Sequence, residues 1–487
     1  MDEESENPNY KTLEKPKLEK SIDEIINNSS LTKYSILNYI NSSIFVFIDG
    51  VEMHFFIFLL IPFREYFNFS KTYESVCASI IFFGFALGSF SVGYLTKIYG
   101  RELVLKATSI SIVLFHLIII IFLNKVIFLI MRFFMGISLG IYFIFLNLFS
   151  EYRPISSRGF QLNLLWAFYQ ISCLIQILIV LMIMPNYEEK KLRLTLLVYL
   201  IFPIIGSIVH YFTLYDSPRN LIVNGEKEKA FTILKDMNNG KELTEEEKLK
   251  IVNEVNISSS NRNVKNHISD LFNKDLFQTT ILLMIIFFIL SGAYYGMNVL
   301  TTITQEKLNG KEKPNNHKVI ISQLVYTITT LIFLIPSAFI IELKYIGRKG
   351  LIVMCFFLAS FISIPSVYIK GSYGVLIGIY VFATFVGANV LITYCVEIYP
   401  TKLRDLSTGF HIMNYRILCG FAQIWVLALF HIKFRLPYFI ICGLCIFGGL
   451  LTYILPYETK DRPLDSKYHN TESDKLNISQ DNSLKEK

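Results

Sequence analysis

The sequence predicts an all-α membrane protein with twelve transmembrane helices in two pseudo-symmetric six-helix bundles. Of its 487 residues, 53% are hydrophobic and only 17% are charged, an apolar excess too large for a soluble protein of this length. Runs such as 110–123 and 127–149 are apolar on every face, unlike the amphipathic helices of soluble domains. Twelve runs are long enough to cross roughly 30 Å of hydrocarbon. A repeated motif pattern relates the two halves of the chain.

The order of the apolar runs gives the predicted organisation. They begin near residues 41, 73, 103, 126, 160 and 192, and then near 276, 318, 350, 373, 405 and 435. We therefore expect an N-terminal tail (1–40), a first bundle (41–214), a linker loop (215–275), a second bundle (276–456) and a C-terminal tail (457–487). Two stretches of the linker have a helical pattern, 226–237 and 244–255. The polar first 35 residues carry no signal-peptide pattern, so the first helix is expected to direct insertion.

The charge distribution predicts the orientation. Basic residues gather in the loops of one side, at Lys97, Arg101, Lys106, Arg153, Arg158, Arg219, Lys344, Arg348, Lys349, Lys402 and Arg404. By the positive-inside rule this side is cytoplasmic, and so are both termini and the linker. The loop with Lys307, Lys311 and Lys313 is an exception. The net charge of +7 thus reflects topology, and we expect no nucleic-acid partner. The sequence does not distinguish the plasma membrane from an internal one.

Paired motifs after corresponding spans form an internal repeat. Residues 100–102 (Gly-Arg-Glu) follow the second span, and residues 347–349 (Gly-Arg-Lys) follow the eighth. Glu, Pro and Arg residues follow the fourth and tenth spans in the same order, at Glu151, Pro154 and Arg158 and at Glu397, Pro400 and Arg404. Matching motifs at matching positions indicate duplicated halves. We expect ion pairs among Arg101, Glu151, Arg158, Arg348, Glu397 and Arg404.

These motifs resemble those of the major facilitator superfamily of transporters. The resemblance covers about residues 41–464 and includes residues 93–101, Arg132 with Gly136 and Gly140, and residues 217–219, 397–401 and 455–460. Residues 49–53, 294–302 and 415–416 resemble the synaptic-vesicle-related and organic-ion branch more than the hexose carriers of the sugar-porter branch. Lys97 and Lys344 depart from the usual acidic residue. The resemblance implies rocking between inward-open and outward-open states, with the loop charges setting the balance.

Charged side chains inside the first and eleventh spans are the first candidates for the site. Asp49 and Glu52 lie three residues apart in an apolar run, so we expect them to couple protons or to recognise a cation. The alternative is an ion pair that merely holds the bundle together. His54 is either a proton relay or a satisfied polar residue. Arg416 is expected to bind a substrate carboxylate, to neutralise Asp49 or Glu52, or to alternate between these roles.

Aromatic and amide side chains on the helices expected to line a central cavity are the second set. They are Trp166, Tyr169, Gln170, Tyr294, Tyr295, Asn298, Asn389 and Tyr394. Such groups stack on and hydrogen-bond an organic ligand, although packing explains any single one. The glycines Gly84, Gly88, Gly136 and Gly140 recur at four-residue spacing, which predicts a close and sliding helix contact.

These observations favour a secondary active transporter of a small organic solute. The expected cargo is an organic ion such as a carboxylate metabolite, moved by alternating access with protons as a candidate coupling ion. A facilitative hexose carrier and a transport-silent membrane sensor remain as alternatives.

No phosphate-binding loop, helical metal motif or nucleophile elbow occurs, so we expect no enzyme activity, no cofactor and no metal. The seven scattered cysteines are read as packing residues. The expected partners are the solute, protons and the lipid bilayer, and the protein is expected to be a monomer.

Overall fold

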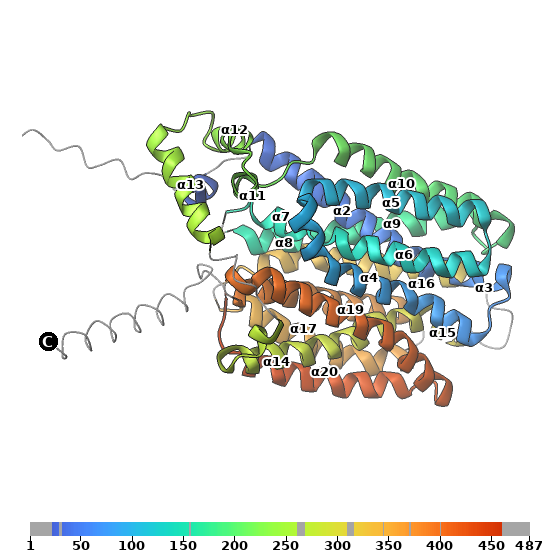
Figure 1. The fold of residues 1–487 in the computed structure, drawn as a ribbon. Coiled ribbons are helices and arrows are strands. Elements are labelled where there is room, and N and C mark those ends of the chain that lie inside the picture. Colours follow the sequence, from blue (N-terminus) through green and yellow to red (C-terminus); the bar gives the residue numbers. More distant parts are fainter. Residues whose placement is uncertain are drawn as a thin grey trace, which may run out of the picture.

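The computed structural model describes residues 22–28, 32–154, 157–260, 268–308, 316–343, 345–369, 372–399 and 401–459. Lys344 and the side chains of Lys97 and Arg404 lie outside the described residues. Within these ranges every regular element is helical, and twelve helices are long and apolar enough to cross a membrane. This confirms the predicted all-α membrane fold. Figure 1 shows the long helices lying side by side along one direction.

The first six spans are built from nine helices. They are α2 (Lys33–Phe58), α4 (Lys71–Tyr99), α5 (Arg101–Phe122), α6 (Lys125–Tyr142), α7 (Phe145–Ser150), α8 (Arg158–Leu165), α9 (Ala167–Ile183) and α10 (Leu192–Thr213), with the short α3 (Leu60–Phe67) extending α2. Helix α2 begins ahead of residue 41, where the apolar run starts. Its polar first turns are stabilised by buried Arg153, which donates to the Ser35 carbonyl oxygen at 2.8 Å and to Asn38 Oδ1 at 3.3 Å.

The last six spans complete the second bundle. They are α14 (Lys274–Ser291) continued by the π-helix η4 (Gly292–Gly296) and α15 (Met297–Leu308), then α16 (Asn316–Ile340), α17 (Gly347–Tyr368), α18 (Tyr373–Ile398), α19 (Thr401–Ile432) and α20 (Leu436–Ile454). A π-helix is rare and widens the backbone locally, often at a functional site. This irregularity was not foreseen from the sequence.

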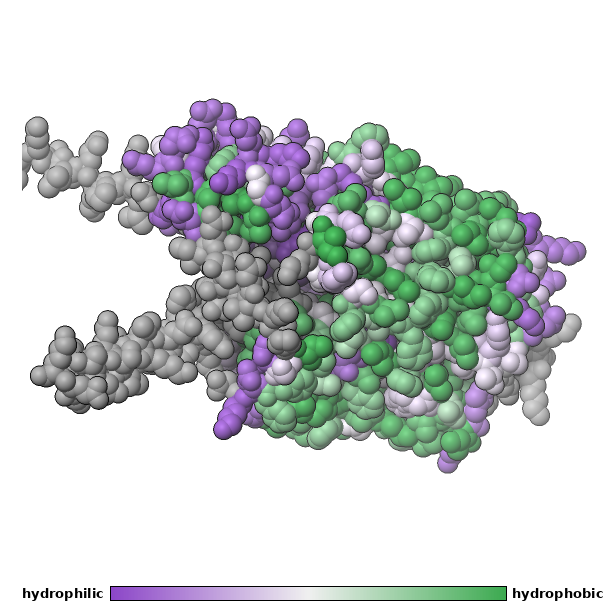
Figure 2. Space-filling view, viewed as in Figure 1, coloured by the Kyte–Doolittle hydropathy of each residue, from purple (hydrophilic) through white to green (hydrophobic). Residues whose placement is uncertain are grey.

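The linker forms a small group of helices at one end of the bundles, α11 (Pro218–Val223), α12 (Lys227–Met237) and α13 (Glu245–Ser260). Helices α12 and α13 agree with the predicted patterns at 226–237 and 244–255. We call this end the linker end and the other the far end. Figure 2 shows hydrophilic residues over the linker helices and a broad apolar surface over the long helices on the visible face, as a bilayer-embedded surface requires.

Helices α4 and α6 pack at very short range through their glycines. A Cβ atom added at Gly88 would collide with the carbonyl oxygen of Ile137, and one at Gly84 with that of Phe133. Gly136 and Gly140 meet the carbonyl oxygens of Ile81 and Phe85 in the same way. The four-residue glycine spacing thus corresponds to the close helix contact that it predicted.

Candidate functional site

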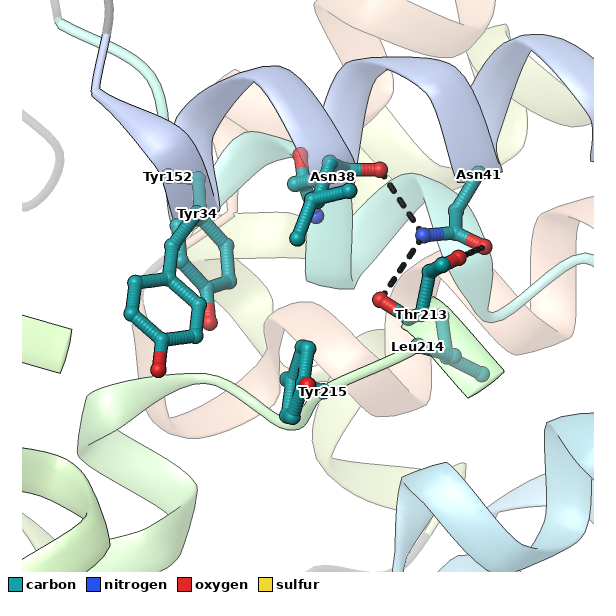
Figure 3. A pocket seen from close by; sticks show the side chains of 8 residues that line it. Tyr34, Asn38, Asn41, Tyr152, Thr213, Leu214 and Tyr215 are labelled. Atoms are coloured by element: carbon teal, nitrogen blue, oxygen red, sulfur yellow. Dashed lines mark hydrogen bonds between the residues drawn. The ribbon is translucent and has the colours of Figure 1, made fainter. Parts of the chain in front are cut away.

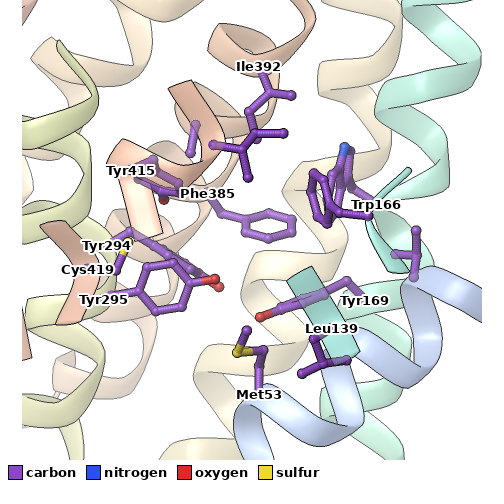
Figure 4. Close-up of a cluster of buried hydrophobic side chains, with 14 of the residues drawn as sticks. Met53, Leu139, Trp166, Tyr169, Tyr294, Tyr295, Phe385, Ile392, Tyr415 and Cys419 are labelled. Atoms are coloured by element: carbon purple, nitrogen blue, oxygen red, sulfur yellow. The ribbon is translucent and has the colours of Figure 1, made fainter. Parts of the chain in front are cut away.

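A cavity lies between the two bundles, with an empty volume of about 310 Å³. Its walls combine four helices and the π-helix, with these lining residues: Asp49, Trp166, Tyr169, Tyr294, Tyr295, Phe385, Ala388, Asn389, Ile392, Tyr415 and Arg416. Figure 4 shows Trp166 and Tyr169 facing Phe385 and the tyrosine pair of the π-helix across this region. Six aromatic rings from both bundles therefore surround one small space.

Asp49 supplies the cavity with a carboxylate. Its residue is 2% exposed, and neither carboxylate oxygen has a hydrogen-bond partner among the described residues. An isolated buried carboxylate is costly because it loses its hydration without compensation. Such a group is expected where a ligand, an ion or a proton completes the site.

Arg416 supplies the opposite charge from α19. It is 3% exposed, its Nη1 donates to Tyr295 Oη at 2.7 Å, and its guanidinium lies 3.9 Å from the centre of the Phe85 ring. Its Nε has no hydrogen-bond partner in the part of the chain that the structure describes. Asp49 and Arg416 line the same cavity, but the described structure contains no ion pair between them. Both residues therefore keep unused hydrogen-bonding atoms among the described residues.

Tyr294 and Tyr295 owe their position to the π-helix. The backbone there is held from two neighbours, since Tyr380 Oη donates to the Ala293 carbonyl oxygen at 2.8 Å and Gln423 Nε2 donates to that of Tyr295 at 2.7 Å. The two tyrosine rings contact each other edge to face, with centroids 4.7 Å apart. Irregular backbone inside a membrane needs hydrogen bonds from neighbouring side chains, because lipid tails provide no hydrogen-bond partners.

The bundles contact each other beyond both sides of the cavity. At the linker end, the Phe160 backbone N–H donates to Glu342 Oε1 at 2.9 Å, and Asn163 Nδ2 donates to Ser337 Oγ at 3.2 Å. At the far end, Tyr187 Oη donates to Gln323 Oε1 at 2.9 Å. The described structure thus has an occluded arrangement, in which polar contacts join the bundles at both ends.

The other candidate residues lie away from the cavity. Glu52 is in the interior of the first bundle beside His116, and His54 packs its ring against Phe58 and Tyr169. Gln170, Asn298 and Tyr394 are buried but are not lining residues. Tyr394 Oη instead donates to the Tyr457 carbonyl oxygen at 2.8 Å.

Four lining residues were missed by sequence reasoning: Phe385, Ala388, Ile392 and Tyr415. Together with Asn389, the first three follow the spacing of one helix face on α18, which was the signal available. Tyr415 adjoins Arg416 in the sequence. His116 was also missed, because a single histidine in an apolar run has no local pattern.

The loop charges form two similar clusters at the linker end. Arg101 Nη1 lies 2.7 Å from Glu151 Oε1 in the first bundle, and Arg348 Nε lies 3.2 Å from Glu397 Oε2 in the second. Burial alone would raise the pKa of Glu151, but Arg101, Ser217 and Arg219 hold this pKa below its usual value.

The second cluster also reaches the first bundle. Arg348 Nη1 lies 3.6 Å from Glu342 Oε2, and Glu342 accepts the hydrogen bond from the Phe160 backbone. Arg158 is half-buried at the start of α8. The Arg404 side chain lies outside the described residues. Arg101 and Arg348 thus form ion pairs with the expected glutamates.

A second, smaller cavity of about 200 Å³ opens near the linker end. It is shown in Figure 3 and is lined by Tyr34, Leu37, Asn38, Asn41, Tyr152, Thr213, Leu214 and Tyr215. Asn41 donates to the carbonyl oxygens of Leu37 and Thr213 and accepts from the Thr213 hydroxyl. Its polar groups are thus largely used within the protein, and this cavity is a weaker candidate for a ligand.

Comparison with known proteins agrees with this geometry. The family described as "Sugar (and other) transporter" matches residues 17–468. The synaptic vesicle 2-related protein of Xenopus laevis is 23% identical over 411 residues, covering 81% of this chain and 73% of that protein. The organic cation/carnitine transporter 7 of Arabidopsis thaliana is 24% identical over 466 residues, covering 85% of this chain and 90% of that protein.

Solved structures share the fold. The proton:xylose symporter XylE bound to 6-bromo-6-deoxy-D-glucose superposes with a TM-score of 0.72 at 16% identity, covering 89% of this chain and 98% of that one. A partially occluded inward-open XylE from E. coli gives 0.68 at 15% identity, covering 89% of this chain and 100% of that one. The resemblance drawn from the motifs is thereby confirmed. The protein belongs to the sugar (and other) transporter family, and it shares the fold of the major facilitator superfamily symporter XylE.

Proposed function

We propose that the protein is a secondary active transporter of a small organic ion that carries a carboxylate group. The observation that carries the proposal is that Asp49 and Arg416 face one aromatic cavity between the bundles without pairing to each other. A site between two bundles, with contacts on both sides of it, fits alternating access. The small enclosed space among six aromatic rings favours a small solute.

The two charges define the substrate chemistry. A guanidinium binds carboxylates through directed hydrogen bonds, and Arg416 Nε has no partner within the described structure. Asp49 would repel a simple anion unless it is protonated or meets a positive group of the substrate. The faces of the surrounding aromatic rings also attract a cation. We therefore favour a zwitterionic carboxylate, with its carboxylate on Arg416 and its ammonium near Asp49 and the rings.

The alternatives gain less support from the site. XylE is described as a proton:xylose symporter, so the structural similarity to it favours a sugar. Asn389 and the tyrosine hydroxyls of the cavity could hydrogen-bond a sugar. A neutral sugar would nevertheless leave only the through-space attraction between Asp49 and Arg416 to balance two buried charges, which is unfavourable. A transport-silent sensor would have no use for these unpaired charges.

The coupling ion, the orientation in the membrane and the oligomeric state are also part of the proposed function. We propose protons as the coupling ion, because buried carboxylates inside transporters commonly exchange them. The basic loops support a cytoplasmic linker end with both termini on that side, in the plasma membrane or an internal one. We propose a monomer, since one chain supplies both halves of the cavity.

Uptake into proteoliposomes tests the proposal. The panel is succinate as an anion, choline as a cation, glycine betaine as a zwitterion and glucose as a hexose, each with and without an imposed pH gradient. We expect gradient-dependent uptake of a carboxylate-bearing solute and its loss in Asp49→Asn and Arg416→Gln. The matched control Arg435→Gln removes an arginine that contacts Tyr368, away from the cavity. Uptake of glucose alone, unaffected by both cavity substitutions, would establish the hexose carrier instead. No uptake of any solute would favour the sensor.

A further inference from the structure

The first bundle contains a second group of buried ionisable side chains, outside the central cavity. His116 Nδ1 on α5 lies 3.0 Å from Glu52 Oε1 on α2, and both side chains are 0% exposed. Arg132 on α6 donates from Nη1 to the main-chain oxygen of Glu52 at 3.2 Å. None of these three residues lines the central cavity.

Each member of this group has an unsatisfied polar atom. Glu52 Oε2, His116 Nε2 and Arg132 Nε have no hydrogen-bond partner among the described residues. A purely structural pair in an apolar interior would be expected to satisfy its polar atoms, because each unsatisfied atom is costly. The Arg132 guanidinium is instead surrounded by rings, 4.9 Å from the centre of Phe55 and 5.1 Å from that of Phe56.

We infer that Glu52 and His116 form a proton-binding site in the first bundle, separate from the substrate cavity. A carboxylate oxygen and an imidazole nitrogen at hydrogen-bond distance can share one proton. The pair can then take up a second proton. A glutamate–arginine pair has no such freedom, since arginine does not release its proton. Histidine is the side chain that ordinarily changes protonation near neutral pH.

The surroundings make the pair responsive to one proton. The ionisable groups that act on Glu52 are Asp49 on α2 and Arg132 and Tyr142 on α6, and Cys77 on α4 acts on Arg132. One proton added to the pair therefore places an extra positive charge in a region of low dielectric. Such a charge strongly changes local electrostatics.

Helix α2 connects this site to the cavity. Glu52 lies three residues after Asp49, nearly one helical turn away, and Arg132 holds the backbone of α2 at Glu52. Loading the pair with a proton therefore acts on the helix that places Asp49 against the substrate. The link to transport rests on the proposed function, whereas proton binding by the pair does not.

Histidine NMR of the purified full-length protein in lipid bilayers tests the site directly, with the proton as the only ligand. The chain has eight histidines, and His116→Gln assigns the His116 signal by its loss. Measured between about pH 5 and 8, this signal should change as the pair takes up a proton. The change should differ in Glu52→Gln, which removes the carboxylate partner of His116. A His116 signal that is constant over this range, or is unaffected by Glu52→Gln, would overturn the inference.

Transport measurements separate the site from the proposed function. In His116→Gln we expect exchange of the panel solute across the membrane to persist, while accumulation driven by the pH gradient is lost. The matched control His210→Gln removes another buried histidine of the first bundle, which lies at hydrogen-bond distance from the Ser109 hydroxyl. Unchanged gradient-driven accumulation in His116→Gln would overturn the link to transport. If the native protein moves no solute of the panel, the proposed function fails, and the NMR titration still decides the proton site.

Discussion

The contact between Glu342 and Phe160 gives a quantitative prediction for the balance of conformations. Glu342 accepts the Phe160 backbone hydrogen bond at 2.9 Å and lies 3.6 Å from Arg348, with its side chain 23% exposed. Glu342→Gln keeps the shape and a neutral hydrogen bond but removes the charge. Charge-assisted hydrogen bonds contribute about 1 kcal/mol more than neutral ones. The Glu342–Arg348 pair lies within the second bundle and does not change on opening, so a loss of about 1 kcal/mol at the contact with Phe160 changes the conformational ratio roughly fivefold.

Spin-label distances at the linker end measure this shift. Tyr99 in the first bundle and Tyr345 in the second are 59% and 96% exposed, so both accept labels. The six other cysteines are buried, so Cys442→Ser, which removes the half-buried one, gives a suitable background. We expect Glu342→Gln to populate longer distances, at about five times the native ratio of open to closed molecules.

The control for this measurement is Glu189→Gln, which neutralises an exposed glutamate at the far end. It should leave the distance distribution between positions 99 and 345 unchanged. An unchanged distribution in Glu342→Gln would show that this contact does not hold the linker end closed. An equal shift in both variants would show that the effect is one of net charge and not of the Glu342 contact.

Three further predictions concern other contacts. Tyr187→Phe removes the far-end hydrogen bond, worth about 1 kcal/mol, so labels at the far end should populate longer distances roughly fivefold more often, and unchanged distances would contradict this. Gly88→Leu places a side chain against the Ile137 carbonyl oxygen and should lower the thermal midpoint of the purified protein or abolish folding, whereas a native midpoint would refute the close contact. Glu151→Gln leaves the Arg101 charge partly buried and should destabilise the protein by about 1 to 3 kcal/mol near neutral pH. Because the pKa of Glu151 is lower in the folded protein, the native pair contributes fully above the ordinary carboxyl range and is lost as pH falls through the folded value, so the two proteins should converge in acid.

Hydropathy was sufficient to predict the architecture because lipid exposure imposes a strong constraint on every span. Each helix must form all of its backbone hydrogen bonds internally and present apolar side chains to the lipid. Both requirements can be recognised in the local sequence. The start of α2 at Lys33 escaped this reasoning, because its polar first turns are stabilised by Arg153 from a distant loop. The π-helix of residues 292–296 depends likewise on Tyr380 and Gln423, which are far away in the sequence.

The residues of the candidate site that could be predicted are charged side chains, which are unusual inside a transmembrane helix. Asp49 and Arg416 stand out in apolar runs, and the structure brings them to one cavity. Their environment was not predictable, since Phe385 and Ile392 are ordinary apolar residues of a transmembrane helix. Asn298 and Tyr394 show the converse, because polar residues of suitable type also occur on helix faces that do not reach the cavity.

The division of charge between the bundles suggests how the two candidate sites work together. The first bundle holds Asp49, Glu52, His116 and Arg132, whereas the cavity charge from the second bundle is Arg416. A proton at Glu52 and His116 therefore stays within one bundle throughout the rocking motion, while a substrate held by Asp49 and Arg416 bridges the two. A ligand that joins the bundles can favour closure only through contacts with both of them. A proton site confined to one bundle must act through that bundle's own helices, and α2, which carries both Asp49 and Glu52, is the element that can transmit its effect.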